Sequence, residues 1–456
     1  MRCIRCARTV SATLAKMSES KVGIDEWLLV LFVALLPCDW LLGTWLPGSG
    51  VFIHIRIADA VFLATCTAWL TRILLGQVKV RTGWLYLPIA VYLAATVASA
   101  FASIDPHASL LELLPELYVL TICAVTYNVV RTPRVLRNVL IAWALGTAIT
   151  AIASITGVVL FYAGVRGEMN PLIRPFGTLP PGNYARFSGL FENSNVACNY
   201  LSIGLLIVLA IRRIQWIRTP VFWLLVVMIA VSATLTLSPG LAGLVLGFCL
   251  WQWADWRKER PFRAKLALFA GCAGALAMCI VTMISPTPLA QESIATAIAR
   301  HHLQPSNRLQ CWEAAVSTVR QYPLLGQGTG LPIRCPPYLR ADGEVEVLGD
   351  AHNSYLNIAA HKGAFGLAGF LTIAGWLLIR AGRWSLASTY DVIVTTLAIA
   401  FVQGFLYQGL AASFELIRHF WVFSGVLMAA IEIRDCSRAA GTAVVPDATS
   451  TAVPAA

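Results

Sequence analysis

The residues best suited to chemistry stand where a polar stretch of the chain meets an apolar one, at Asp350-Ala351-His352-Asn353. An imidazole group has a pKa of about 6.5, so His352 is the side chain best placed to take a proton from a hydroxyl group at neutral pH. The alternative is a histidine that only supports the start of a helix. His361 is expected near the same face, where it would act on His352 indirectly.

A second candidate stands at the start of a short amphipathic helix predicted within Pro305 to Gly330, PSNRLQCWEAAVSTVRQYPLLGQGTG. The segment is too short to span a membrane, so we expect an interfacial helix that lies near the membrane surface. Ser306 or Asn307 can cap this helix, and Pro323 ends it. Its apolar residues recur at helical spacing: Leu309, Trp312, Val316 and Val319. In the first turn, Arg308 adds a planar guanidinium to free N–H groups and the helix dipole, a combination that binds phosphate. The alternative is that Arg308 only reaches lipid headgroups.

Polar side chains also precede an earlier apolar segment, between Arg186 and Asn195. Arg186 is followed by apolar residues and a glycine, and a charge held near a membrane boundary is costly, which indicates a function. The carboxamides of Asn193 and Asn195 could bind sugar hydroxyls or cap the helix that follows, and we expect one of them to be the cap. Asn195, and Asn353 beside His352, are the candidate carboxamides for substrate binding.

Acidic residues that could hold a metal are few in these polar stretches. Glu344 and Glu346, with Asp342 and Asp350 nearby, form one cluster. They could bind a divalent cation, but a run of carboxylates on a loop is normally only solvated, so we expect no metal site. The sequence also carries no nucleotide-type phosphate-binding loop and no nucleophile elbow, so we expect no cofactor.

The elements that position these residues must be membrane helices, because hydrophobic residues make up 58% of the 456 positions and charged residues only 12%, with a mean hydropathy of +0.71. A soluble domain carries about 25% charged residues. Apolar stretches of about 20 residues, enough to cross about 30 Å of hydrocarbon, predict an all-α polytopic protein with about twelve transmembrane helices. The predicted spans are 27–46, 57–76, 83–103, 109–130, 138–163, 195–211, 220–237, 240–256, 265–284, 364–380, 390–409 and 414–433.

Most of the 34 basic residues fall in alternate connections between these spans. Such clusters set membrane orientation, so the net charge of +11 does not indicate nucleic-acid binding, and both termini are expected in the cytoplasm. The predicted order is a basic cytoplasmic arm (1–22), helices 1–9 (23–284) with an outer loop at about 164–192, a large outer loop (285–351), helices 10–12 (352–435) and a disordered cytoplasmic tail (436–456). His352, Arg308 and Arg186 then all face the outer side.

Most of the twelve cysteines lie in apolar segments, where cysteine behaves as a small buried hydrophobic residue. Only Cys311 and Cys335 share a polar loop. They could form a disulfide if that loop faces an oxidising compartment.

Three segments in this order resemble the O-antigen ligase and polymerase (WaaL/Wzy) superfamily: RFSGLFENSNVA (186–197), NRLQCWEAA…PLLGQGTG (307–330) and AHNSYL…KGAFGL (351–367). The resemblance implies a bacterial inner-membrane enzyme whose active site faces the periplasm. It would move O-antigen from undecaprenyl diphosphate to a sugar hydroxyl of lipid A–core, without metal or nucleotide. His352 matches the family histidine that activates the acceptor. Arg308 matches the arginine assigned to the donor diphosphate, and Arg186 matches the arginine of R-x-x-G-x-x-x-N-x-N.

One position departs from the family pattern. Many relatives carry Ser-Arg-Gly at the turn that here reads Leu237-Ser238-Pro239-Gly240. Proline carries no charge, so either Arg186 or Arg300 must complete the diphosphate site, or the sequences are out of register here. The ligase activity is the preferred interpretation. A Wzy-type polymerase would use the same donor, and a lipid-linked oligosaccharide transporter would instead need ionisable residues deep within its helices.

Overall fold

The computed structural model describes residues 23–39, 41–45, 53–81, 83, 86–165, 178–179, 184–185, 187–191, 193–254, 274, 287–288, 303–304, 307–339, 345–382 and 384–439. Helices dominate these ranges: α2 Ile24–Leu35, α3 Ile57–Leu74, α4 Tyr86–Phe101, α5 Pro106–Leu111, α6 Leu113–Val129, α7 Pro133–Tyr162, α8 Ser194–Arg213, α9 Thr219–Leu235, α10 Gly240–Ala254, α13 Asn307–Gln321, α14 Ser354–Ala381, α15 Thr389–Phe401, the π-helix η2 Val402–Tyr407, the 3₁₀ turn η3 Gln408–Leu410 and α16 Arg418–Ala439.

The strands form four antiparallel pairs of two strands each. They are β1 Leu41–Trp45 with β2 Ile53–Arg56, β3 Thr178–Leu179 with β4 Tyr184–Ala185, β5 Thr287–Pro288 with β6 Leu303–Gln304, and β7 Tyr338–Leu339 with β8 Val345–Glu346. These short ribbons connect helices and make no common sheet.

Several of the helices can cross a membrane, and the protein is an all-α multi-pass membrane protein. Among the described residues, six helical segments are long and apolar enough: Ile57–Leu74, Pro106–Val129, Pro133–Tyr162, Ser194–Arg213, Ser354–Ala381 and Thr389–Leu410. Helices α4, α9 and α10 are apolar but shorter. The predicted span at 265–284, and the predicted terminal arm and most of the predicted tail, lie outside the described residues.

The predicted first span, 27–46, is wrong at its carboxyl-terminal end. Helix α2 stops at Leu35, and residues 41–45 form strand β1 instead. Pro37 explains the difference, because a proline disfavours helical geometry at the residue before it and cannot donate a helical hydrogen bond. The ends of the other predicted spans that fall in the described ranges coincide with helix ends to within about six residues, apart from 364–380, whose helix α14 begins ten residues earlier. The span 390–409 comprises α15, η2 and η3 together.

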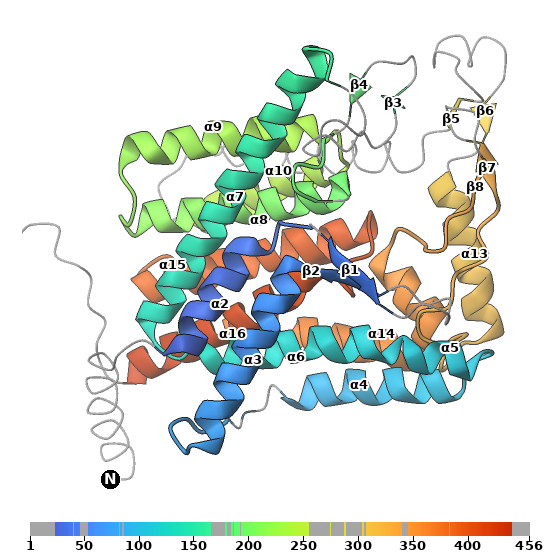
Figure 1. Cartoon of the computed structure of the whole chain (residues 1–456), viewed down its shortest axis with the longest axis horizontal. Coiled ribbons are helices and arrows are strands. Elements are labelled where there is room, and N and C mark those ends of the chain that lie inside the picture. The colour runs from blue at the N-terminus through green and yellow to red at the C-terminus, as the bar shows by residue number, and fades with distance from the viewer. Residues whose placement is uncertain are drawn as a thin grey trace, which may run out of the picture.

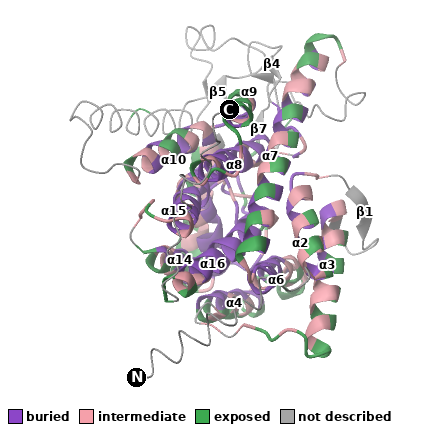
Figure 2. Ribbon diagram, turned by 90° about the vertical axis from the view of Figure 1, so that its left-hand side faces the viewer, coloured by how far each residue is buried: buried purple, intermediate pink, exposed green. Residues whose placement is uncertain are grey.

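The helices pack into a bundle with one element lying across it. In Figure 1, α4 and α6 run side by side, and α13 stands beside their ends and crosses their direction. Figure 2 shows that burial concentrates on α8, α15 and α16, whereas α3 exposes much of its surface. Large apolar side chains face outward on α3 and α9, as at Leu74, which is 85% exposed, and Trp223, which is 59% exposed. Lipid is the natural solvent for such a surface.

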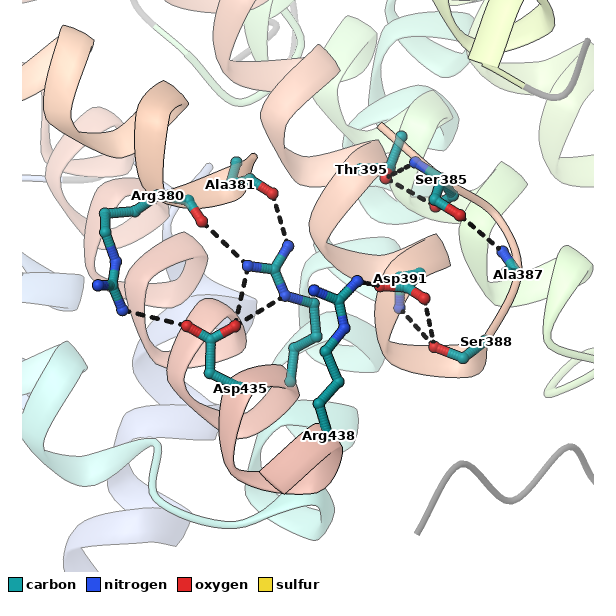
Figure 3. Close-up of polar contacts among 10 residues, drawn as sticks. Arg380, Ala381, Ser385, Ala387, Ser388, Asp391, Thr395, Asp435 and Arg438 are labelled. Carbon is teal, nitrogen blue, oxygen red and sulfur yellow. Dashed lines mark hydrogen bonds and ion pairs between the residues drawn. The ribbon is translucent and has the colours of Figure 1, made fainter. Parts of the chain in front are cut away.

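Helix α14 starts at one end of the bundle, here called the loop end, and finishes at the other, here called the basic end. At the basic end, the Arg434 guanidinium donates to the carbonyl of Ala381 (2.6 Å) and that of Arg380 (3.0 Å). Arg380 pairs with Asp435 at 3.1 Å, and Arg438 pairs with Asp391 of α15 (Figure 3). The last carbonyls of α14 thereby gain donors, and α14, α15 and α16 are joined at one point.

Candidate functional site

The loop end is organised by a break in helix α14. Gly363 has φ 62° and ψ −163°, far from helical values. The segment that follows α13 enters this break: the N–H of Gln327 donates to the carbonyl of Ala360 (2.9 Å), and the N–H of Ala364 donates to the carbonyl of Pro323 (2.9 Å). Two further bonds, Gly328 N–H to His361 O and Phe365 N–H to Leu324 O, complete the joint. Polar backbone groups that the break frees are therefore satisfied by the loop.

Two glycines make this joint possible. Gly326 and Gly363 both have positive φ, at 73° and 62°. A Cβ on Gly363 would lie 2.2 Å from the backbone of Leu324, and a Cβ on Gly326 would lie 2.3 Å from the backbone of His361. Only glycine fits such an approach. The sequence segments PLLGQGTG and KGAFG, far apart in the chain, are thus the two halves of one structural unit.

His352 is held by its neighbour Asp350. The backbone N–H of His352 donates to Asp350 Oδ1 (2.7 Å), and its Nδ1 lies 2.8 Å from the same oxygen. His352 adopts φ 47°, an unusual conformation for a residue with a side chain, and such conformations concentrate at functional sites. Its side chain remains 29% exposed. Because Nδ1 faces Asp350, the opposite nitrogen, Nε2, is directed away from the carboxyl group and can face a substrate.

The charge of Asp350 is favoured by this contact. Burial of the carboxyl group would raise its pKa, but the side-chain and backbone hydrogen bonds from His352, and the charge of His352, lower it by more. The pKa of Asp350 therefore lies below its ordinary value. A carboxylate kept ionised beside Nδ1 orients the ring and stabilises its protonated form.

Asn353 fixes the position of His352 relative to α14. Its side-chain oxygen accepts hydrogen bonds from the N–H groups of Tyr355 (3.0 Å) and Leu356 (3.1 Å), and so it caps the helix. Its amide nitrogen donates to the carbonyl of Leu410 (3.3 Å). The side chain is 5% exposed. Asn353 thus ties the first turn of α14 to η3, and its predicted role in substrate binding stays a prediction.

A cavity of about 280 Å³ lies beside Asp350. It is bounded by the α5–α6 junction, the segment after α13, the first half of α14 and the loop before α16. The lining residues are Glu112, Glu116, Thr329, Gly330, Gly349, Asp350, Asn357, Ile358, His361, Lys362, Ser413, Glu415 and Leu416. Four carboxyl groups face one lysine, so the cavity disfavours an anionic ligand.

Two buried contacts support the cavity wall. Lys362 and Glu116 form an ion pair in which each side chain is 2% exposed, and Lys362 Nζ also donates to the hydroxyl of Tyr92 (2.6 Å). Glu415 accepts a hydrogen bond from the amide of Asn357, and burial raises the pKa of Glu415. The other end of the Asn357 amide accepts from the N–H of Ala351 (3.3 Å), next to His352. These contacts link α6, α14 and the loop before α16.

Arg308 lies in the first turn of α13, as predicted, and the predicted helix is confirmed at Asn307–Gln321. The apolar residues at helical spacing do not define its contact with the rest of the protein, because Leu309 and Val316 are exposed. The buried face centres instead on Cys311 and Ala315, which pack with a small cluster completed by Ile333, Cys335, Ala351 and Ala360. Small residues allow α13 to approach the start of α14 closely, which is the physical reason for the shifted face.

The remaining predicted residues are placed as follows. Arg186, Arg300 and Glu344 lie outside the described residues. Asn193 is the cap of α8 and accepts from the N–H of Asn195 (2.8 Å), so the expectation that one of the pair is a cap is confirmed. The side-chain oxygen of Asn195 accepts from the hydroxyl of Ser238 (2.8 Å), one residue before Pro239. The R-x-x-G-x-x-x-N-x-N segment and the Ser-Pro-Gly turn are therefore in contact.

Of the residues that the structure describes, no three His, Cys, Asp or Glu are grouped so as to hold a metal ion.

Sequence reasoning missed the roles of Asp350, Lys362 and Glu415. The Asp350-x-His352 spacing is a local signal that could have indicated an orienting carboxylate. Lys362 and Glu116 are 246 residues apart, and Asn357 and Glu415 are 58 apart, so neither contact has a local signature.

In a comparison with known families, a family model described as O-antigen ligase matches residues 220–371. This range begins in α9, contains α13 with Arg308, and ends beyond His352 and the break in α14. It does not reach the segment 186–197. No curated protein matches the chain.

Proposed function

We propose that this chain, which belongs to the O-antigen ligase and polymerase superfamily, transfers a glycan from undecaprenyl diphosphate to a hydroxyl group, with His352 as the general base. The observation that carries the proposal is the Asp350–His352 pair at the start of α14, packed beside the helix that bears Arg308. The matched family implies a lipid-linked polysaccharide substrate. We assign the ligase activity, with lipid A–core in the bacterial inner membrane as acceptor and the loop end in the periplasm.

In the proposed reaction, His352 Nε2 takes the proton of the acceptor hydroxyl. The hydroxyl oxygen forms a bond to the anomeric carbon while the bond from that carbon to the diphosphate oxygen breaks, and the electron pair leaves with the diphosphate. Direct displacement inverts the anomeric centre. Asp350, already ionised beside Nδ1, stabilises the imidazolium that forms. General-base assistance of this kind contributes roughly 10²–10⁴-fold to the rate.

The diphosphate leaving group is expected on the α13 side of His352. The cavity beside Asp350 carries four carboxyl groups and disfavours an anion. Arg308 combines a guanidinium with the amino terminus of α13, a setting in which developing negative charge is stabilised. We propose that Arg186 or Arg300 supplies the second cationic contact in place of Pro239.

A transporter would use its buried ionisable groups to carry charge. Here Glu116 and Lys362 are paired with each other next to the loop end, and their side chains are 2% exposed. A fixed ion pair of this kind supports the cavity wall, which favours the enzyme over the transporter.

Deletion of the gene, followed by complementation, tests the proposal. Cells that lack a ligase should make lipid A–core without O-antigen and accumulate lipid-linked polymer. Accumulation of core bearing a single repeat would instead identify a polymerase.

Complementing variants test the residue roles. His352→Ala should reach the membrane at the wild-type level and lose transfer. Arg308→Lys should impair transfer because an ammonium cannot replace a bidentate guanidinium. His107→Ala, which changes an exposed histidine of α5, is the matched control. Full transfer by His352→Ala would contradict the assignment of the base.

A further inference from the structure

Two cysteines meet beside the proposed site. Cys311 on α13 is 2% exposed and Cys335, in the extended segment after it, is 5% exposed. Both belong to the small apolar cluster that joins α13 to the start of α14. Their thiols hydrogen-bond to each other, and this contact raises the pKa of Cys311 and lowers that of Cys335. The two side chains, separated by 24 positions in the sequence, are thus neighbours in the fold.

The pair lies between the two groups that the proposed reaction needs. Cys311 follows Arg308 by one turn of α13. Cys335 contacts the carbonyl of Asp350 through its sulfur (3.6 Å), and Asp350 holds the His352 ring. The neighbouring backbone is also paired, because the N–H of Ile333 donates to the carbonyl of Gly349 (2.9 Å). Arg308 and Cys311 thus share one turn of α13, and contacts run from Cys311 through Cys335 and Asp350 to His352.

We propose that Cys311 and Cys335 form a disulfide bond that fixes α13 against the segment that contacts Gly349 and Asp350, next to the general base. The proposal rests on the proposed function in one respect, the location of the loop end in an oxidising compartment. The oxidant is a disulfide of a thiol–disulfide exchange partner in that compartment. The thiolate of Cys335 attacks it to form a mixed disulfide, and Cys311 then displaces the partner's thiol. The protein loses two protons and two electrons, and the partner's disulfide becomes two thiols.

The bond would restrict the loop end without passing through the membrane bundle. It closes the chain between residues 311 and 335, and so limits how far α13 can move from the segment around Ile333 and Cys335, which packs beside the start of α14. Cys335 contacts the carbonyl of Asp350, so the bond would also hold the segment next to His352 near the turn of α13 that bears Arg308. Transfer should depend on the bond, because leaving group and base must act on the same anomeric carbon.

The oxidation state can be read directly from cells. Cells expressing the full-length protein are treated with N-ethylmaleimide before lysis, and the digested protein is analysed by mass spectrometry without reduction. We expect a linked peptide pair containing Cys311 and Cys335 in the wild type and its loss in Cys311→Ser. Alkylation of both residues in the wild type would overturn the proposal.

A topology measurement separates this failure from failure of the proposed function. Glu313→Cys places a thiol on the exposed face of α13, and Cys436, exposed at the basic end, is the internal control. An impermeant maleimide should label position 313 and spare Cys436 in intact cells. Labelling at 313 together with free Cys311 and Cys335 overturns only the disulfide. Protection at 313 overturns the proposed orientation, and the disulfide with it.

A separate assay tests whether the rate of glycan transfer depends on the disulfide bond. Dithiothreitol should lower transfer by the wild type severalfold and leave the rate of the Cys311→Ser/Cys335→Ser variant unchanged. An equal response of the two proteins would overturn the coupling.

Discussion

Charged side chains hold helix α14 at both of its ends, but they do so in different surroundings. At the basic end, the Arg380 and Asp435 side chains are 47% and 39% exposed, and their pair lies near water. At the loop end, Lys362 and Glu116 are each 2% exposed. An exposed ion pair contributes little to the free energy of folding and loses little hydration. A buried pair loses much of its hydration and must offset that free energy through close, well-oriented contacts. The exposed pair at the basic end therefore closes the bundle, whereas the buried pair at the loop end forms part of the wall of the cavity beside Asp350.

Removal of the buried lysine should have the largest effect. Lys362→Met leaves the Glu116 carboxylate buried without its cation, which costs about 3–5 kcal/mol in a site of this kind. We expect a clear fall in the thermal unfolding temperature of the protein purified in detergent.

The matched control is the double variant Glu116→Gln/Lys362→Met, in which no charge is left uncompensated. It should recover most of the lost stability. If Lys362→Met alone unfolds at the wild-type temperature, the stability of the loop end does not depend on its buried ion pair. The two ends of α14 would then not differ in this respect.

Asp350→Asn should have an intermediate effect, on transfer more than on folding. The hydrogen bond from His352 Nδ1 to the carboxylate is lost or reoriented, and a bond to a charged group is worth about 1.5–3 kcal/mol. That corresponds to a fall of roughly 10- to 100-fold in the transfer rate. Glu313→Gln, on the exposed face of α13, should leave the rate unchanged.

The pH dependence of the same variant gives a further check. The native pKa of Asp350 lies below its ordinary value of about 4, so the carboxylate stabilises the folded protein at pH values above about 4. This stabilisation is lost as the pH falls through the lower native value. The difference in stability between wild type and Asp350→Asn should therefore be constant near neutrality and shrink in acid. A difference that grows in acid would contradict the depressed pKa.

The smallest effect is expected at the basic end. Arg380→Ala removes an exposed partner of Asp435, and exposed pairs contribute about 0–1 kcal/mol. Thermal unfolding should be nearly unchanged, and any effect should disappear at high salt. A loss as large as that of Lys362→Met would show that the two ends are equivalent.

Sequence patterns predicted the elements that depend on local chemistry. The apolar runs marked most helices, and Pro323 and the apolar periodicity placed α13 to within a few residues. The early end of α2 was also predictable, because Pro37 stands where the helix stops. His352 was identified from its position at the edge of a polar loop, although its role stays a prediction.

Contacts between distant segments were not predictable from these patterns. The joint between Gly326 and Gly363 depends on two backbones that approach in space, and a single sequence does not reveal which glycines meet. The buried face of α13 differed from its periodicity because small residues, Cys311 and Ala315, allow closer packing than the larger ones. The Lys362–Glu116 pair likewise joins α14 to α6, two helices that are far apart in the sequence.

The break in α14 also has a consequence for depth in the membrane. The whole helix has 28 residues and would be about 42 Å long, more than the roughly 30 Å of the hydrocarbon layer. The part after the break, Ala364 to Ala381, is about 27 Å long and matches that layer. If the part before the break runs on in the same direction, it places His352 about 15 Å beyond that layer, at the level expected for lipid headgroups. In the proposed reaction a diphosphate attached to a lipid lies at that level, so the position of a single glycine would set the height at which His352 meets it.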